Sequence, residues 1–138
     1  IKEGLRDGTI DVIATDHAPH ATQEKQQGFT EAPFGIVGLE TALSLTLALV
    51  EEGVLSLESA IEKLSAAPAR AFGLAKGTLA VGADADVVII DPQAQWDVDP
   101  VKFRSKSRNT PFAGWKLKGL VMTTFVAGRL VFEAPVPA

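Results

Sequence analysis

The fold is decided by the stretch Asp11-Val12-Ile13-Ala14-Thr15-Asp16-His17-Ala18-Pro19-His20. Its first half is a short run rich in β-branched residues that follows a glycine turn, which predicts a buried strand over residues 11–15. Its second half places a carboxylate and two imidazoles directly after that strand. Because α/β folds carry their chemistry at the carboxyl ends of buried strands, the stretch predicts an α/β protein with a functional site at this point.

On either side of this stretch the sequence predicts helices and a long loop. Residues 1–6 fit the end of a helix that Asp7-Gly8 closes. Residues 21–34 are polar and predict a surface loop of the kind that often carries function. Helical spacing predicts a well-buried helix from Val37 to Glu52, which Gly53 ends. The apolar positions expected to define its buried face are Leu39, Ala42, Leu43, Leu47 and Val50.

Two shorter helices are predicted next. Ser56 is the expected N-cap of the first of them, because a serine hydroxyl satisfies the free N–H groups of a helix start. Pro68 either stops that helix or opens the second, which is predicted from Ala69 to Phe72 and closed by Gly73. Together with residues 1–53, these segments give the order helix, strand, loop and three helices.

Beyond Gly77 the pattern changes from helices to strands. Residues 82–86 predict a turn, and the apolar run after them predicts a strand that Asp91-Pro92 ends. Two later apolar runs flank Ala127-Gly128 and predict a β-hairpin. The strands expected in this half are residues 87–90, 117–126 and 129–132. Residues 134–138 are expected to form a loose tail.

The composition argues against several kinds of site and partner. A net charge of −4 gives no electrostatic reason to expect nucleic acid or an anionic membrane as a partner. Without cysteine the chain has neither disulfides nor thiolate metal ligands, which fits a reducing cytoplasm without requiring it. The longest apolar run, residues 42–50, is too short and too interrupted by polar residues to span a bilayer.

The chain is expected to be a piece of a longer protein. It opens Ile1-Lys2-Glu3-Gly4, with neither an initiator methionine nor a signal peptide. In addition, the single strand predicted at residues 11–15 cannot bury both of its faces without partner strands. Both observations lead us to expect that the longer protein supplies partner strands for this segment.

Asp16, His17 and His20 form the only tight cluster of acid–base or metal-binding side chains in the sequence. A carboxylate after a strand suits a divalent metal or proton transfer. The alternative is that Asp16 caps the following turn and the histidines lie on the surface. Residue spacing alone leaves both interpretations open. The cluster does not complete a catalytic zinc site, which needs about three protein ligands.

Five segments resemble bacterial class I dihydroorotases of the amidohydrolase superfamily. Residues 11–20 resemble the last barrel strand and its signature, and residues 32–41 (Ala-Pro-Phe-Gly-Ile-Val-Gly-Leu-Glu-Thr) resemble the substrate-loop motif. Residues 67–74, 76–79 and 82–91 resemble segments that follow the barrel in the superfamily. The first two motifs are the more specific and favour dihydroorotases over hydantoinases and allantoinases.

The resemblance implies an α/β fold. The expected parent is a (β/α)₈ TIM-barrel metal-dependent hydrolase with a small β-sandwich. Residues 1–75 would supply the C-terminal part of the barrel, with its last strand, substrate loop and following helices. Residues 76–138 would supply the C-terminal strands of the sandwich. The similarity covers nearly the whole chain.

The resemblance also assigns roles to individual residues. Asp16 matches a ligand of a binuclear zinc centre that also shuttles a proton. His20 matches the residue that binds the substrate carboxylate, and Phe34 and Gly35 match loop positions whose backbone contacts the substrate. His17 receives no metal-binding role and is expected to make a structural hydrogen bond.

The implied reaction is the reversible cyclisation of N-carbamoyl-L-aspartate to L-dihydroorotate in pyrimidine biosynthesis, in the cytoplasm. The alternatives are a cyclic amidase acting on hydantoin or allantoin, and an inactive scaffold subunit for aspartate transcarbamoylase. A homodimer and a complex with aspartate transcarbamoylase are both compatible with the resemblance. The family's remaining metal ligands, a His-x-His pair, a lysine and two histidines, have no counterpart here, so we expect the 138-residue chain alone to be inactive.

Three further groups of residues have a structural interpretation. They are the basic residues Arg104, Lys106 and Arg108, the aromatic residues Trp96, Trp115 and Phe125, and the acids Asp84 and Asp86. The basic run predicts a solvated loop, with a minor part in closing the site as the alternative. The aromatics predict core or interface contacts. The acids belong to the turn before a strand and suggest no acid–base task.

Overall fold

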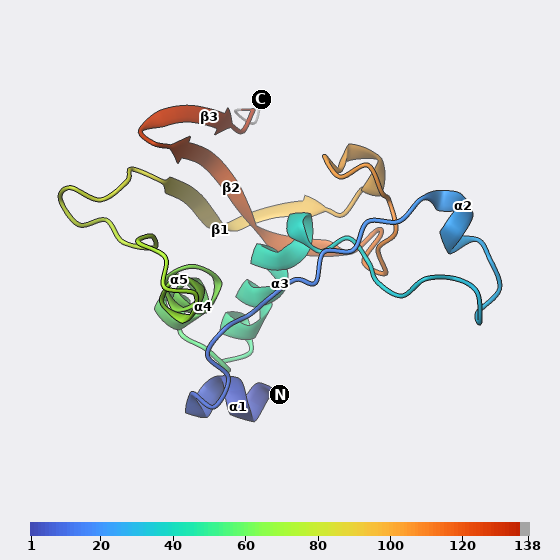
Figure 1. Ribbon diagram of the computed structural model, residues 1–138, viewed down its shortest axis with the longest axis horizontal. Helices are drawn as coiled ribbons and strands as arrows, with labels where there is room; N and C mark the ends of the chain where they lie inside the picture. Colours follow the sequence, from blue (N-terminus) through green and yellow to red (C-terminus); the bar gives the residue numbers. More distant parts are fainter. Residues whose placement is uncertain (136–138) are drawn as a thin grey trace.

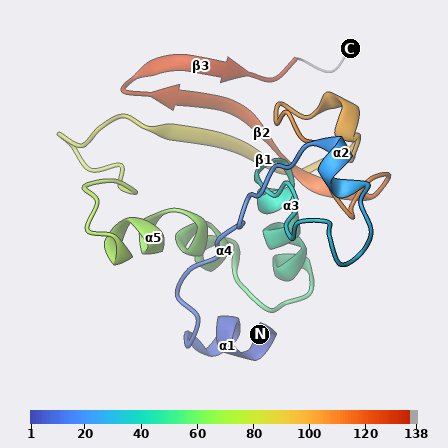
Figure 2. The ribbon, with the colours of Figure 1, turned by 45° about the vertical axis from the view of Figure 1, so that its right-hand side comes forward.

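The computed structural model describes residues 1–135 and has the predicted mixture of helices and strands (Figure 1). Its elements are α1 (Lys2–Asp7), α2 (Thr22–Lys25), α3 (Leu39–Glu51), α4 (Leu57–Leu64), α5 (Ala66–Ala71), β1 (Val87–Asp97), the 3₁₀ helix η1 (Pro100–Lys102), β2 (Lys116–Val126) and β3 (Arg129–Glu133). The strands form an antiparallel sheet in the order β1-β2-β3. Figure 2 shows α3, α4 and α5 below this sheet, with α1 farthest from it. The predicted α/β class is therefore confirmed.

The hairpin of β2 and β3 forms where the sequence predicts it. Its two turn residues, Ala127 and Gly128, have φ values of 48° and 74°. Two successive positive φ values are what a tight two-residue hairpin turn requires. The strand pairing continues past β3, because the backbone N–H of Ala134 donates to Met122 O at 2.8 Å. Residues 136–138 of the expected tail lie outside the described part of the chain.

The first strand of the sheet is longer than predicted. β1 does not end at Asp91-Pro92, because its pairing with β2 is interrupted there and resumes at Gln95. Asp91 Oδ1 accepts the backbone N–H groups of Gln93 and Ala94 at 2.8 and 3.1 Å. This side chain satisfies the backbone where proline provides no donor, so the strand bulges and continues.

Several predicted helix boundaries are confirmed and two are corrected. Gly8 closes α1 with φ 85°, and the hydroxyl of Ser56 accepts Ser59 N–H at 3.1 Å as the cap of α4. Pro68 lies inside α5, in its first turn, rather than before it, because no intrahelical donor is needed there. The loop predicted at residues 21–34 contains the one-turn helix α2. Within residues 1–135, each helix is too short or too polar to cross a lipid bilayer.

The helix α3 buries most of its predicted face and several small polar residues as well. Leu47 is buried, and Ala42, Leu43 and Val50 are half-buried. The buried side chains of the helix are Thr41, Ser44, Thr46 and Leu47, whereas Leu39 is 63% exposed. Ser44 Oγ donates to Gly119 O of β2 at 2.8 Å and accepts the indole N–H of Trp96 at 3.0 Å. Small polar residues allow the helix and strand backbones to approach closely, and their hydrogen bonds satisfy the buried polar atoms.

The predicted strand at residues 11–15 is not paired in this structure. The only bridge in its vicinity joins His17 to Ile36. Ile13 N–H instead donates to Lys63 O of α4 at 3.0 Å, and Lys63 Nζ donates to Ile10 O. A strand exists only through hydrogen bonds to neighbouring strands, and no strand among the described residues lies beside this segment. An apolar hollow of about 410 Å³ lies between it and α3.

Two hydrophobic clusters hold the elements together. Leu5, Val54, Leu55 and Ala60 form the first, which lies entirely within residues 1–75. Val37, Val98, Phe103 and Leu117 form the second, with Trp96 packed against it as predicted for a core aromatic. The second cluster joins residues from both predicted domains, and the division after residue 75 stays a prediction.

An ion-pair cluster fastens the turn at residues 82–86 to its surroundings. Lys76 Nζ lies 2.6 Å from carboxylate oxygens of both Asp84 and Asp86. Asp86 Oδ1 also accepts Ala127 N–H at 2.8 Å, which connects the turn to the β2–β3 hairpin. These contacts raise the pKa of Lys76 to about 12 and lower the pKa of Asp86. The acid pair therefore has a structural role, in agreement with its interpretation from sequence.

Replacing Lys76 with methionine is expected to reduce the decrease in the thermal midpoint that acid pH causes. Because Lys76 lowers the pKa of Asp86, the contribution of Asp86 is present above its ordinary pKa of 3.8 and is lost as the pH falls through the lower folded-state value. The contribution of Lys76 is complete below pH 10.5 and is lost as the pH rises through about 12. Thermal midpoints between pH 5 and pH 2 measure the difference, because the loss begins below pH 3.8. Lys116→Met, which removes one exposed pair with Asp97, is the control, and parallel profiles for wild type and Lys76→Met would contradict the prediction.

Candidate functional site

Asp16 lies at the end of the extended segment that precedes the substrate-loop motif. Its φ of 43° is a left-handed conformation, which aspartate tolerates better than most residues but which still stores strain. The residue is exposed. Its carboxylate accepts no hydrogen bond from, and forms no ion pair with, any residue within 1–135. A strained residue with an unengaged carboxylate is suited to a ligand or a proton-transfer partner.

His17 caps the start of α3. Its Nδ1 accepts the backbone N–H groups of Gly38 and Leu39 at 3.1 and 3.4 Å. The ring thus supplies the acceptor that Gly38, the N-cap residue, lacks. A Cβ on Gly38 would lie 3.0 Å from Thr15 O, so the close approach also depends on glycine. With Nδ1 as acceptor, the neutral ring carries its proton on Nε2 and presents no lone pair to a metal. The structural hydrogen bond expected for His17 is confirmed.

His17→Ala is expected to destabilise the protein by about 1 kcal/mol, the usual cost of a lost N-cap acceptor. His17→Asn is the matched control, because the asparagine side-chain oxygen can occupy the position of Nδ1. The asparagine variant should therefore retain most of the stability. Chemical denaturation of the three proteins measures the effect. Equal losses in both variants would show that the ring, rather than its acceptor, stabilises the site.

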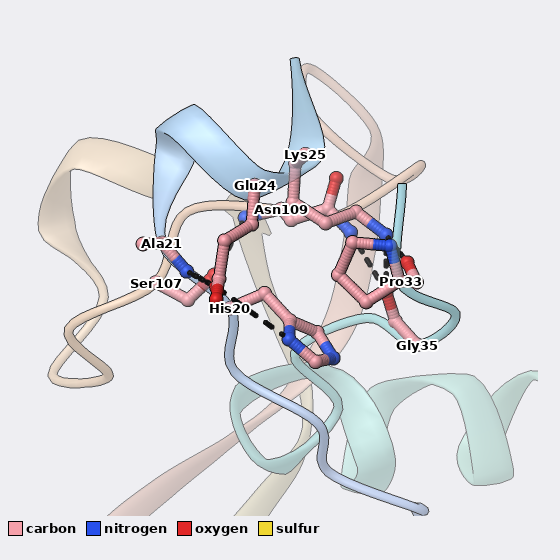
Figure 3. A network of polar contacts seen from close by, with 8 residues as sticks. All are labelled: His20, Ala21, Glu24, Lys25, Pro33, Gly35, Ser107 and Asn109. Atoms are coloured by element: carbon pink, nitrogen blue, oxygen red, sulfur yellow. Dashed lines mark hydrogen bonds and ion pairs between the residues drawn. The ribbon is translucent and has the colours of Figure 1, made fainter. Parts of the chain in front are cut away.

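The structure brings together His20 and Gly35, which are predicted to bind substrate. A Cβ on Gly35 would lie 3.6 Å from His20 Nε2 and 2.4 Å from the Cβ of Ala18. Gly35 also has φ 109°, so no other residue fits there without rearrangement. His20 Nδ1 lies 3.8 Å from Glu24 Oε2 (Figure 3). The side chain of Phe34 is 93% exposed, which is compatible with a role for its backbone.

Comparisons with known proteins show the family of the chain. The model of the amidohydrolase family matches residues 1–131.

The chain belongs to the amidohydrolase family.

Among curated members, the dihydroorotase of Syntrophotalea carbinolica is 58% identical over 133 residues, and that of Geobacillus sp. (strain WCH70) is 56% identical over 132 residues. These alignments cover 96% and 95% of this chain but 31% of each relative, so the chain spans less than a third of their length. The predicted resemblance to dihydroorotases is confirmed.

The solved structures that resemble this chain are hydantoinases and dihydropyrimidinases rather than dihydroorotases. The L-hydantoinase (dihydropyrimidinase) of Arthrobacter aurescens superposes with a TM-score of 0.87 at 39% identity, covering 96% of this chain and 31% of that chain. The dihydropyrimidinase of Brevibacillus agri NCHU1002 superposes with a TM-score of 0.89 at 29% identity, covering 96% of this chain and 30% of that chain. The arrangement of residues 1–135 is therefore one that occurs within complete amidohydrolases.

Amidohydrolases are generally metal-dependent, and Asp16 fits one ligand position of a metal site. Its carboxylate is exposed and unengaged, and oxygen ligands suit zinc. However, no three His, Asp or Glu side chains in the described part of the chain are close enough to hold an ion together. His17 is excluded as a further ligand by its cap hydrogen bonds. The described residues therefore offer one candidate metal ligand, Asp16, and do not form a complete metal site by themselves.

Two residues at the site were missed by the sequence interpretation. Lys25 Nζ donates to Pro33 O at 2.6 Å and to Gly35 O at 3.1 Å. Asn109 Nδ2 also donates to Gly35 O, at 2.9 Å, from a position 74 residues away in sequence. No motif marks these two side chains as a pair. Their role follows only from the contacts that the fold creates.

Proposed function

We propose that the full-length protein is a dihydroorotase. It would hydrolyse L-dihydroorotate to N-carbamoyl-L-aspartate, with one water consumed, and would run the reverse cyclisation with one water released. The observation that carries the proposal is the identity of 52% to 58% with curated dihydroorotases over 96% of this chain. The solved hydantoinases and dihydropyrimidinases reach 39% at most among those described above.

The residues of this chain support distinct parts of that reaction. Two zinc ions, when bound, would polarise the amide carbonyl. Asp16 would accept a proton from the attacking water and deliver it to the departing ring nitrogen. His20, when protonated, would pair with the substrate carboxylate. The backbone at Phe34 and Gly35 would contact the same end of the substrate, since Gly35 lies beside the His20 ring.

The proposal includes the architecture of the whole protein. Residues 11–15 would pair with barrel strands contributed by the rest of the polypeptide, and the apolar hollow beside α3 supports this, because an apolar surface needs a cover. Residues 76–138 would belong to the β-sandwich. The isolated 138-residue chain would have no hydrolase activity, since its metal ligands are incomplete. A cytoplasmic location, a homodimer and a complex with aspartate transcarbamoylase also belong to the proposal.

The second candidate is a related cyclic amidase. It is favoured by the TM-scores of 0.87 and 0.89 to enzymes named for hydantoin and dihydropyrimidine hydrolysis. An inactive scaffold subunit is the third, and the unengaged carboxylate of Asp16 argues against it.

Steady-state assays of the purified full-length protein with dihydroorotate, hydantoin and allantoin separate these three functions. We expect kcat/KM to be highest for dihydroorotate. A preference for hydantoin or allantoin would establish the cyclic amidase. If a folded and metal-loaded protein hydrolysed none of the three substrates, the scaffold function would be favoured.

A further inference from the structure

The loop of residues 33–36, beside His20, is held by hydrogen bonds to two of its backbone carbonyl groups. Lys25 Nζ donates to Pro33 O and to Gly35 O, and Asn109 Nδ2 also donates to Gly35 O (Figure 3). Lys25 is partly buried and forms no ion pair with any acid in residues 1–135. Its ammonium group therefore donates to backbone oxygens. Partial burial of a charged group costs desolvation free energy, and these hydrogen bonds to the loop offset that cost.

The segment that carries Asn109 is itself firmly attached. The backbone carbonyl of Asn109 accepts the N–H of Val37, the residue directly after the loop, at 2.9 Å. Glu40 Oε1 of α3 accepts Ser105 N–H, also at 2.9 Å. Phe103 is buried in the same cluster as Val37. Asn109 thus reaches the loop from a rigid support rather than from a free surface turn.

Holding the carbonyls also fixes the directions of the loop N–H groups. In a planar trans peptide the N–H points opposite to the C=O of the same unit. The bond to Pro33 O therefore turns the N–H of Phe34 away from Lys25, and the bonds to Gly35 O turn the N–H of Ile36 away from Lys25 and Asn109. The N–H of Ile36 is on the side of the parallel bridge between His17 and Ile36, so it belongs to that pairing. The N–H of Phe34 has no acceptor within residues 1–135. The loop is therefore left with one free backbone donor, the N–H of Phe34, which an anionic ligand can accept.

We propose that Lys25 and Asn109 are positioning residues that hold the loop of residues 33–36 so that its free backbone donor, the N–H of Phe34, faces the anionic substrate. This inference rests on the proposed function, because the substrate end that this donor would meet is the carboxylate assigned to His20. It makes substrate affinity depend on a side chain from the C-terminal half of the chain. Both residues would act through the loop backbone rather than on the reacting amide, so substrate binding should suffer more than turnover.

The test uses the full-length enzyme with Lys25→Met, Lys25→Arg, Asn109→Ala and Asn109→Asp. We expect Lys25→Met and both Asn109 variants to raise KM for dihydroorotate by about tenfold, the scale of one hydrogen bond, while kcat changes by less than about twofold. Lys25→Arg keeps the donors and should restore KM to within about threefold of wild type. Lys102→Met is the charge control, because this lysine is 82% exposed on η1, and its KM should not change.

Hydrogen exchange of the peptide spanning residues 33–38 gives a readout that does not need turnover. Lys25→Met and Asn109→Ala should accelerate exchange there at an unchanged thermal midpoint. If the wild type is active but KM and exchange are both unchanged in the variants, the positioning role is overturned while the proposed function stands. If the wild type does not hydrolyse dihydroorotate, the proposed function fails, and the substrate-orienting role fails with it even where exchange shows that the clamp exists. If Asn109→Ala lowers the thermal midpoint, the Lys25 variants decide the outcome.

Discussion

Asp16→Ala in the full-length protein is expected to lower kcat/KM for dihydroorotate by about 10³-fold or more. A positioned general acid–base group contributes roughly 10²- to 10⁴-fold, and the loss of a metal ligand would add to this. The structure supports the large value, because the carboxylate is exposed and unengaged and its backbone is strained at φ 43°. Strain at a residue without a structural contact is typical of a functional position.

Two variants make this prediction specific. Asp16→Asn tolerates the left-handed backbone as aspartate does but cannot accept a proton, so it should lose nearly as much activity as the alanine variant. Asp11→Ala removes another exposed carboxylate from the same segment and should retain activity. Full activity in Asp16→Asn would refute the proton-transfer role. Bound metal, measured by elemental analysis, separates a lost ligand from a lost base.

Gly119→Ala is expected to destabilise the protein by about 3 kcal/mol, from overpacking and a backbone conformation that alanine disfavours. Gly119 has φ 98°, and a Cβ there would lie 2.3 Å from Leu47 Cδ1. Leu47 is buried, so its side chain has little room to retreat. The displaced helix would also stretch the bond from Ser44 Oγ to Gly119 O.

Gly82→Ala is the matched control for this substitution. Gly82 has a similar φ of 89°, but a Cβ there would meet nothing within 4 Å. The two variants therefore share the backbone cost and differ in the clash. Denaturant unfolding should show the larger loss for Gly119→Ala. Equal losses would mean that α3 and β2 separate easily, and the close contact between them would then contribute little to stability.

The features that sequence predicted correctly depend on neighbouring residues. The Ala127-Gly128 turn, the Ser56 cap and the Gly8 helix end each follow from the conformational preference or hydrogen bonding of one or two residues. The features that were missed or wrong depend on distant ones. The burial of Ser44 in α3 depends on Trp96 and Gly119, which helical periodicity does not include. The segment at residues 11–15 has a strand-forming sequence but no strand beside it.

The candidate site also has parts that neighbouring residues determine and parts that distant residues determine. The motif around Asp16 and His20 and the loop at Gly35 could be singled out because each is contiguous in sequence and resembles a family motif. The structure places Gly35 beside His20, and the roles of these residues stay predictions. The hydrogen-bonding role of His17 was also predicted, although its partners are 21 and 22 residues away. Lys25 and Asn109 were missed because hydrogen bonds to carbonyl groups leave no pattern in side-chain composition.

The cluster that joins Val37 to Val98, Phe103 and Leu117 has a consequence for recombination between relatives. A chimera with its crossover after residue 75 would place the loop-flanking Val37 of one parent against three core residues of the other. Such hybrids would have to match side-chain volumes at these four positions before their catalytic motifs could be compared. We therefore expect the loop and the C-terminal strands to tolerate exchange between relatives only as one unit.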